Sequence, residues 1–234
     1  MTAASTARQA VAEAAVVLSR LGLVTAFGHV SARFGESMLI TPGTDLATVS
    51  EDGIVPVPIA ATSLPTAAPA EAWVHLAIYR GRPDVAAVAR AQPPGTFAVA
   101  ASTKELKPVH GQAAWLGTSV PVHDDARLLR SAELAGAAAA RLSAGNALLL
   151  RGNGAITVGA EPGIAVARMW LLAAACDIWM GNPPGRTSTT LRRDEISAWQ
   201  AVQDELLPRL WHHLLRRASA AQPVTGHDTD WSLA

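Results

Sequence analysis

Apolar side chains repeat at helical spacing in several long segments of the chain and form short continuous runs between them. Residues 7–21 carry one apolar stripe, and Gly22 follows as a stop signal, which predicts a helix there. The same pattern predicts further helices over 69–80, 96–102, 128–142, 162–180 and 194–217. Short apolar or β-branched runs predict strands after Gly28 and over 38–41, 55–59, 85–91, 120–122, 147–150 and 155–158.

These helices and strands alternate, with connections too short for a regular parallel winding. The pattern therefore predicts an α/β protein in which helices are layered on a mixed sheet. Pro56 and Pro58 place the 55–59 strand at an edge, because proline cannot donate a hydrogen bond to a neighbouring strand. Asn182-Pro-Pro-Gly185 separates the last two helices. A single domain over 1–217 is expected, followed by a polar, loose tail over 218–234.

The composition favours a well-covered globular protein that binds a small molecule. Half of the residues are apolar, 16% are charged, and the formal net charge is +0. No global field attracts nucleic acid or a membrane surface, and the seven tryptophans lack the interleaved basic cluster of a stacking platform. Little repulsion between copies favours self-association. We therefore expect a homo-oligomer with a small-molecule substrate and with neither a nucleic-acid nor a membrane partner.

Several features indicate the compartment. Cys176 is the only cysteine in the sequence, so an intrachain disulfide is impossible and a reducing interior is the simplest setting. The first ten residues lack the basic start and apolar core of a signal peptide. The apolar run 165–180 is shorter than the roughly 20 residues that span a bilayer, and it contains Arg168 and Asp177. A cytoplasmic protein is expected.

Four segments carry the most distinctive residues. They are Gly28-His-Val-Ser-Ala-Arg33 with Ile40-Thr-Pro-Gly43; Glu71-x3-His75-x3-Tyr79-Arg80 with Arg82-Pro-Asp-Val85; Ala87-Val-Ala-Arg-Ala-Gln-Pro-Pro94; and Leu150-Arg-Gly-Asn-Gly-Ala-Ile-Thr-Val-Gly159. In this order and spacing, across residues 10–180, they resemble the class II aldolase/adducin family. The resemblance implies a three-layer α/β/α fold around a central mixed, largely antiparallel sheet, and a tetramer with sites at subunit boundaries.

The resemblance also shows where this chain departs from the family. Family members usually read His-x-His-Pro where this chain has Arg90-Ala-Gln92-Pro, and Arg-Gly-His-Gly where it has Asn153 between two glycines. Those histidines hold a divalent metal in the family, whereas arginine stays protonated and amides are poor zinc ligands. No metal and no other cofactor is therefore expected. The Ser-Ser pair that binds phosphate in the family's phosphosugar enzymes is Pro69-Ala70 here, which argues against a phosphorylated sugar.

The resemblance assigns roles to individual residues. Glu71 stands at the position of the family's catalytic acid/base, although a carboxylate in the first turn of a helix also suits the helix dipole. His29 falls in a loop that lines the family's substrate site, where it is either structural or the imidazole that transfers a proton near neutral pH. Arg90 would supply charge in place of the metal, and Gln92 and Asn153 would supply hydrogen bonds. Four more substrate contacts are expected, the last two by reaching into a neighbouring subunit: Thr41, Gly43, His110 and Gln112.

Other polar residues near these segments have structural explanations. Glu71, His75 and Tyr79 share one helical face, and packing against the sheet explains the last two better than chemistry does. Ser31 and Arg33 are expected to stabilise a turn after Gly28.

Two functions are compatible with this site. The first is a metal-independent lyase-type enzyme acting on a small, unphosphorylated carbonyl or carboxylate compound, for instance in specialised metabolism. The step could be a decarboxylation, dehydration, cyclisation or aldol-type reaction. One guanidinium and two amides stabilise an enolate less than a dication does, so an easy step fits better than a demanding retro-aldol. The second is a non-catalytic scaffold or regulatory subunit like the family's adducin branch. The polar character of all three replacements favours the enzyme.

Overall fold

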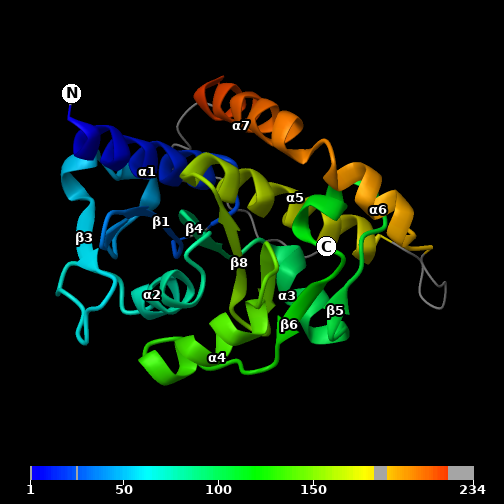
Figure 1. Cartoon of the computed structure of the whole chain (residues 1–234), viewed down its shortest axis with the longest axis horizontal. Helices are drawn as coiled ribbons and strands as arrows, with labels where there is room; N and C mark the ends of the chain where they lie inside the picture. The colour runs from blue at the N-terminus through cyan, green and yellow to red at the C-terminus, as the bar shows by residue number, and fades with distance from the viewer. Residues whose placement is uncertain (1, 25, 182–188, 221–234) are drawn as a thin grey trace, which may run out of the picture.

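The computed structural model describes residues 2–24, 26–181 and 189–220, with an eight-stranded sheet at its centre (Figure 1). Within these residues every strand pairing is antiparallel except the parallel pair β6–β7. The spatial order is β3 (Val55–Pro58), β2 (Ser37–Ile40), β1 (His29–Phe34), β4 (Ala87–Ala91), β8 (Gly154–Gly159), β7 (Ala147–Leu150), β6 (Val120–His123) and β5 (Glu105–Leu106). The 55–59 strand thus lies at an edge, as its two prolines predict.

Helices cover both faces of the sheet and enclose two apolar cores (Figure 1). One core is formed with α1 (Ala3–Arg20), α3 (Pro94–Ser102), α5 (Pro162–Met180) and α7 (Gln203–Ala220). The other is formed with α2 (Ala72–Gly81) and α4 (Ala132–Leu142). The predicted three-layer α/β/α fold with a mixed, largely antiparallel sheet is confirmed. The remaining elements are α6 (Arg193–Gln200) and the 3-10 helices η1 (Leu46–Thr48), η2 (Glu51–Gly53) and η3 (Gly111–Leu116).

The longest described helix, α5, is a core helix. It is the one helix of the described chain that is long and apolar enough to cross a membrane, but 67% of its apolar window is buried inside the protein. The 19 residues of α5 cover the helix predicted over 162–180. Arg168 on this helix donates from Nη1 to the carbonyl of Val158 at 2.8 Å and from Nη2 to Oε1 of Gln203 at 3.3 Å. The charge that interrupts the apolar pattern therefore ties α5 to the sheet and to α7.

Several predicted boundaries were wrong. The helix expected from residue 128 begins at Ala132, after Ser131 caps it by accepting a hydrogen bond from the amide of Leu134. The helix expected over 194–217 is two helices, α6 and α7, and α7 continues to Ala220, beyond the expected domain limit. The expected break at 182–185 and residues 221–234 lie outside the described residues.

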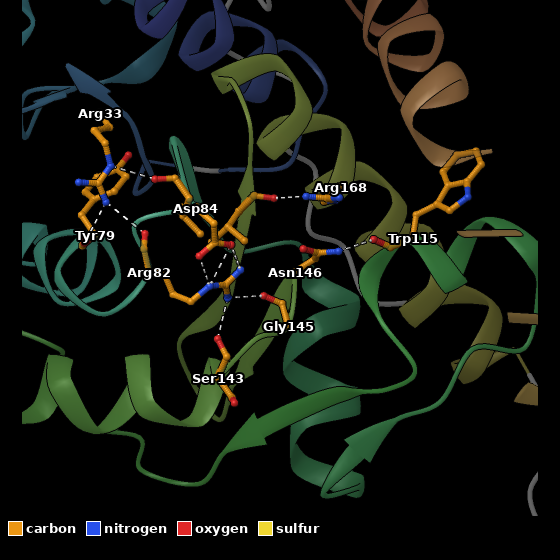
Figure 2. Close-up of polar contacts among 11 residues, drawn as sticks. Arg33, Tyr79, Arg82, Asp84, Trp115, Ser143, Gly145, Asn146 and Arg168 are labelled. Carbon is orange, nitrogen blue, oxygen red and sulfur yellow. Dashed lines mark hydrogen bonds and ion pairs between the residues drawn. The ribbon is translucent and has the colours of Figure 1, made fainter. Parts of the chain in front are cut away.

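Two arginines hold the connection between α2 and β4 in place (Figure 2). Arg33 of β1 donates to three carbonyls, those of Tyr79 at 2.7 Å, Arg82 at 3.1 Å and Val85 at 3.1 Å. Arg82 pairs with Asp84 and also donates to the carbonyls at 143 and 145, at 2.6 and 3.1 Å. Arg33 therefore cross-links a loop from within a strand, rather than stabilising a turn after Gly28 as the sequence suggested.

Candidate active site

A cleft of about 510 Å³ lies beside the paired strands β1 and β4. It lies at the end of this pair where β1 begins, opposite the end that carries Arg33. In the antiparallel register, His29 at the start of β1 faces Arg90 near the end of β4. Six of the sequence-predicted site residues line this cleft: His29, Gly43, Glu71, Arg90, Gln92 and Asn153. The fold thus brings together residues that lie up to 124 positions apart in the chain, from His29 to Asn153.

Arg90 is the most deeply buried charge of the cleft, with 1% of its surface exposed. Its Nη2 lies 3.2 Å from Oε2 of Glu71 and also donates to the side-chain oxygen of Asn153. Its Nη1 is buried and has no hydrogen-bond partner among the residues that the structure describes. Burial lowers the pKa of Arg90, and the Glu71 carboxylate opposes that shift. Arg90 is therefore a buried charged donor whose hydrogen-bonding capacity is only partly used within the described structure.

Glu71 contacts residues outside its own helix. It occupies the N-cap position of α2, and within the described structure its side chain makes no capping hydrogen bond. Oε1 instead accepts from Nδ2 of Asn153 at 3.0 Å and from the amide of Leu129 at 3.3 Å, while Oε2 faces Arg90. Three groups from outside α2 contact this carboxylate, so it is held by the site and not by the helix terminus.

Asn153 is presented by the turn between β7 and β8. Gly152 and Gly154 have positive φ angles of 69° and 81°, which glycine adopts without strain. A Cβ atom at position 154 would lie only 2.2 Å from the carbonyl oxygen of Ala91, so the turn packs directly on the end of β4. Nε2 of Gln92 then lies 3.3 Å from the side-chain oxygen of Asn153. Glu71, Arg90, Gln92 and Asn153 consequently form one hydrogen-bonded group.

His29 is a neutral imidazole in this setting. Burial lowers its pKa well below 6.5, and the nearby His75 and Arg90 lower it further. Its Nδ1 is buried without a hydrogen-bond partner in the described part of the chain. The expected titration near neutral pH is therefore wrong, because a histidine with such a pKa is already deprotonated there. It can still accept a hydrogen bond or a proton.

Beneath His29 lies a buried polar cluster that does not line the cleft. The Ser31 hydroxyl is 2.7 Å from Nδ1 of His75 and 2.8 Å from the Tyr79 hydroxyl. The rings of His29 and His75 pack edge to face at 5.9 Å between centroids. Burial, followed by Arg90, lowers the pKa of His75 to about 3. This packing role for His75 and Tyr79 is the one that the shared helical face suggested.

Three predicted substrate contacts fall outside the cleft lining. Thr41 is fully buried, and its hydroxyl accepts a hydrogen bond from the amide of Val30 at 3.2 Å. His110 and Gln112 lie at the start of η3, which packs against α6. Their expected reach into a neighbouring subunit stays a prediction.

Three cleft residues were missed by sequence reasoning: Phe27, Leu128 and Arg130. Leu128 and Arg130 were hidden because the predicted helix began four residues too early. Ser131 followed by Glu133 is a helix-start signal that would have placed these residues in a loop. Phe27 carried no comparable signal.

The residues at the family's metal position do not fit a divalent ion. Arg90 offers only donors, and the side-chain oxygen of Asn153 is already bonded to Arg90 and Gln92. A guanidinium would also repel a dication. Across the described residues, no group of three or more His, Cys, Asp or Glu side chains could hold a metal ion.

Comparison with known proteins identifies the class. Residues 9–180 match the family described as the Class II Aldolase and Adducin N-terminal domain, and the chain belongs to this family. A relative in Arthrobacter keyseri, 3,4-dihydroxyphthalate decarboxylase, is 32% identical over 169 residues, covering 63% of this chain and 67% of the relative.

Solved structures agree with this assignment. An L-fuculose 1-phosphate aldolase superimposes with a TM-score of 0.78 at 21% identity, covering 87% of this chain and 98% of the aldolase. YgbL from Escherichia coli, described as a putative aldolase/epimerase/decarboxylase, superimposes with a TM-score of 0.74 at 20% identity, covering 85% of this chain and all of that one. At these identities the likeness concerns the fold alone.

Proposed function

We propose that this protein is a lyase that decarboxylates a small, unphosphorylated hydroxy acid without a metal. The observation that carries the proposal is the buried Arg90, which lines the cleft, is ion-paired with Glu71 at 3.2 Å and has a buried Nη1 without a hydrogen-bond partner in the described chain. The similarity to a decarboxylase supports the same reaction class. The chemistry of these side chains is the basis for proposing a reaction without a metal and an unphosphorylated substrate.

Arg90 is suited to stabilise the charge that decarboxylation creates. When a carboxylate leaves as CO₂, the electron pair of the broken C–C bond stays with the substrate and delocalises onto a neighbouring oxygen. A fixed guanidinium at the cleft stabilises that oxygen without reorganising. Gln92 and Asn153 hold the guanidinium at its place, since both bond within the same group. Decarboxylation of an activated acid is an easy enough step for a single charge.

Glu71 would carry the proton. Its carboxylate accepts the proton of a substrate hydroxyl, which raises the electron density at the carbon that bears the departing carboxylate, and returns the proton to that carbon as CO₂ leaves and the electron pair of the broken bond stays with the substrate. The oxygen that remains then takes one proton from solvent, so each CO₂ released consumes one proton overall. His29 would accept a hydrogen bond from another polar group of the substrate.

On the side of α2, the residues that line the cleft just before Glu71 offer no side-chain donors for a phosphate group. Pro69 and Ala70 line it just before Glu71, and neither carries a side-chain hydrogen-bond donor. This is where the family's phosphosugar enzymes have two serines. The residues therefore favour an unphosphorylated substrate.

The oligomeric state is a separate part of the proposal. We infer a cytoplasmic homotetramer, because near-zero net charge and several exposed large apolar side chains favour association. Light scattering at micromolar concentration should give about four times the 24.3 kDa chain mass. A 24.3 kDa particle would contradict the inference.

The function is tested by measuring CO₂ release from a panel of hydroxylated benzoic acids and 3-oxo acids. Turnover of at least one compound should persist in EDTA, and elemental analysis should find no stoichiometric zinc, manganese or iron. Glu71→Gln should lower the rate by about 10²–10⁴-fold, since it keeps the shape but removes the base. Glu133→Gln, which changes an exposed first-turn carboxylate of α4, is the matched control and should keep the wild-type rate.

Two outcomes would contradict the proposal in different ways. Loss of turnover in EDTA with recovery on adding zinc would show a metal enzyme. No CO₂ from any compound, with assembly intact, would favour the scaffold instead.

A further inference from the structure

Arg130 is an unassigned cation of the same cleft. It lies in the loop between β6 and α4, is exposed, and lines the cleft together with Arg90. In the described chain its guanidinium makes no hydrogen bond and no ion pair. Arg127, three residues earlier, is fully engaged by comparison, with three hydrogen bonds to the Asp125 carboxylate. The difference shows that this loop does not need the Arg130 charge for its own structure.

The charge balance of the cleft makes Arg130 important. The Arg90 charge is compensated by Glu71 at 3.2 Å, and His29 is neutral. The positive charge of Arg130 is therefore the uncompensated one among the lining residues. Arg90 orients an acid through directed hydrogen bonds, whereas Arg130 supplies the net attraction for an anion.

Apolar side chains stand at the exposed side of the cleft. Phe27 is 66% exposed and Leu128 is 47% exposed, and both line the cleft with Arg130. Large apolar side chains left in water beside an unpaired cation are suited to the ring of a planar anionic ligand. Pro69 and Ala70 add further nonpolar lining.

We propose that Arg130 binds a second carboxylate of the substrate, so that the cleft takes a planar hydroxylated diacid. The hydroxyl oxygen that Arg90 stabilises and the first carboxylate beside it lie at the Arg90 end of the cleft, and the ring lies against Phe27 and Leu128. The role of the first carboxylate rests on the proposed decarboxylation. The second carboxylate of a diacid compensates the exposed guanidinium of Arg130, whereas a monoacid leaves that charge unmet.

Calorimetric titration with unhydroxylated aromatic acids tests the proposal independently of turnover. Phthalate, isophthalate and terephthalate are the diacid probes, and benzoate is the monoacid probe. We expect at least one diacid to bind wild-type protein about tenfold more tightly than benzoate, because a charge-assisted hydrogen bond is worth roughly that factor. Arg130→Gln should remove this advantage and change the benzoate affinity by less than about twofold, whereas Arg130→Lys should keep part of it.

Arg127→Gln is the matched control, because it removes a nearby exposed charge that does not line the cleft. It should keep the diacid advantage. Light scattering should give the same mass for wild type and all three variants, which separates ligand binding from a subunit contact at Phe27 and Leu128.

An advantage for the diacid that survives Arg130→Gln, or diacid binding no tighter than benzoate binding to wild-type protein, would overturn the proposal. Absence of CO₂ release with the Arg130-dependent preference intact would instead contradict the proposed function alone. Decarboxylation of a diacid at an undiminished rate in Arg130→Gln would leave the function standing and remove the second carboxylate site.

Discussion

Arg33 on β1 and Arg90 on β4 lie at opposite ends of the same pair of strands, and their side chains have different kinds of hydrogen-bond partner. Arg33 donates to three backbone carbonyls and lies 4.9 Å from the centre of the Tyr79 ring (Figure 2). Arg90 faces a carboxylate and an amide and keeps one N–H group without a partner in the described structure. An arginine saturated by carbonyls acts as a cross-link, whereas one with a spare donor beside a carboxylate is prepared for a ligand.

The strongest test of this contrast is substitution of Arg90. Arg90→Ala should lower the decarboxylation rate by about a hundredfold or more, which corresponds to about 3 kcal/mol of transition-state stabilisation. Arg90→Lys should also be damaging, since a lysine keeps the charge but loses the planar fork. Steady-state kinetics with added guanidinium ion provide the readout, and partial rescue of Arg90→Ala is expected.

Thermal melts of both Arg90 variants must show a folded protein, because removing one partner of a buried pair also destabilises the fold. Full activity in Arg90→Ala would remove Arg90 from the site.

Substitution of Arg33 should do the opposite. Arg33→Met keeps the apolar stem but leaves three carbonyls unpaired, so the free energy of unfolding should fall by about 2–3 kcal/mol, with kcat unchanged. Urea denaturation measures the loss. Arg80→Met is the control, because Arg80 also donates to two carbonyls but is exposed, so water replaces it at little cost. A kcat that falls with Arg33→Met would show that the two arginines do not have separate roles.

The pH dependence of stability sharpens the contrast further. The folded-state pKa of His75, about 3, lies below its ordinary 6.5, so the unfolded chain binds a proton in this range that the folded chain does not. Its contribution to stability is therefore present above pH 6.5 and is lost as the pH falls toward 3. Between pH 7 and pH 5 this loss amounts to about 2 kcal/mol.

His75→Gln should remove that part of the pH slope, whatever its effect at pH 7. Urea denaturation at both pH values measures the difference. Parallel slopes in wild type and variant would mean that the imidazole is not held neutral by burial and Arg90.

Most of the fold was predictable because periodic burial dominates it. The apolar stripe of residues 7–21 and the run 162–180 became α1 and α5, since each buries one continuous surface. The split between α6 and α7 was not predictable, because it depends on a tertiary contact. Trp115 donates from Nε1 to the carbonyl of Trp199 at 2.8 Å, and the same carbonyl accepts from the amide of Val202 at 3.4 Å, whereas a continuous helix would bond it to the amide of Gln203.

The site was predictable in its deep part and not at its opening. Glu71, Arg90 and Asn153 were placed together by a resemblance that spans their segments, and the structure links them by hydrogen bonds. Arg130 was missed because its position depends on where a helix begins, which sequence patterns locate only to within a few residues. The neutral state of His29 depends on burial by residues far apart in the chain, so no local pattern indicated it.

The turn at Gly152 and Gly154, at the start of β8, is positioned by backbone packing and not by the side chains of the site. Close backbone packing of Gly154 on Ala91 sets the position of the turn, so positions 90, 92 and 153 meet whatever side chains they carry. The reaction type can then change by point mutation of these side chains, while the fold stays the same. Arg90→His, Gln92→His and Asn153→His together should accordingly create a zinc site, detectable by metal titration. On the same backbone, a few substitutions can therefore exchange a bound divalent metal ion for an arginine side chain, or the reverse.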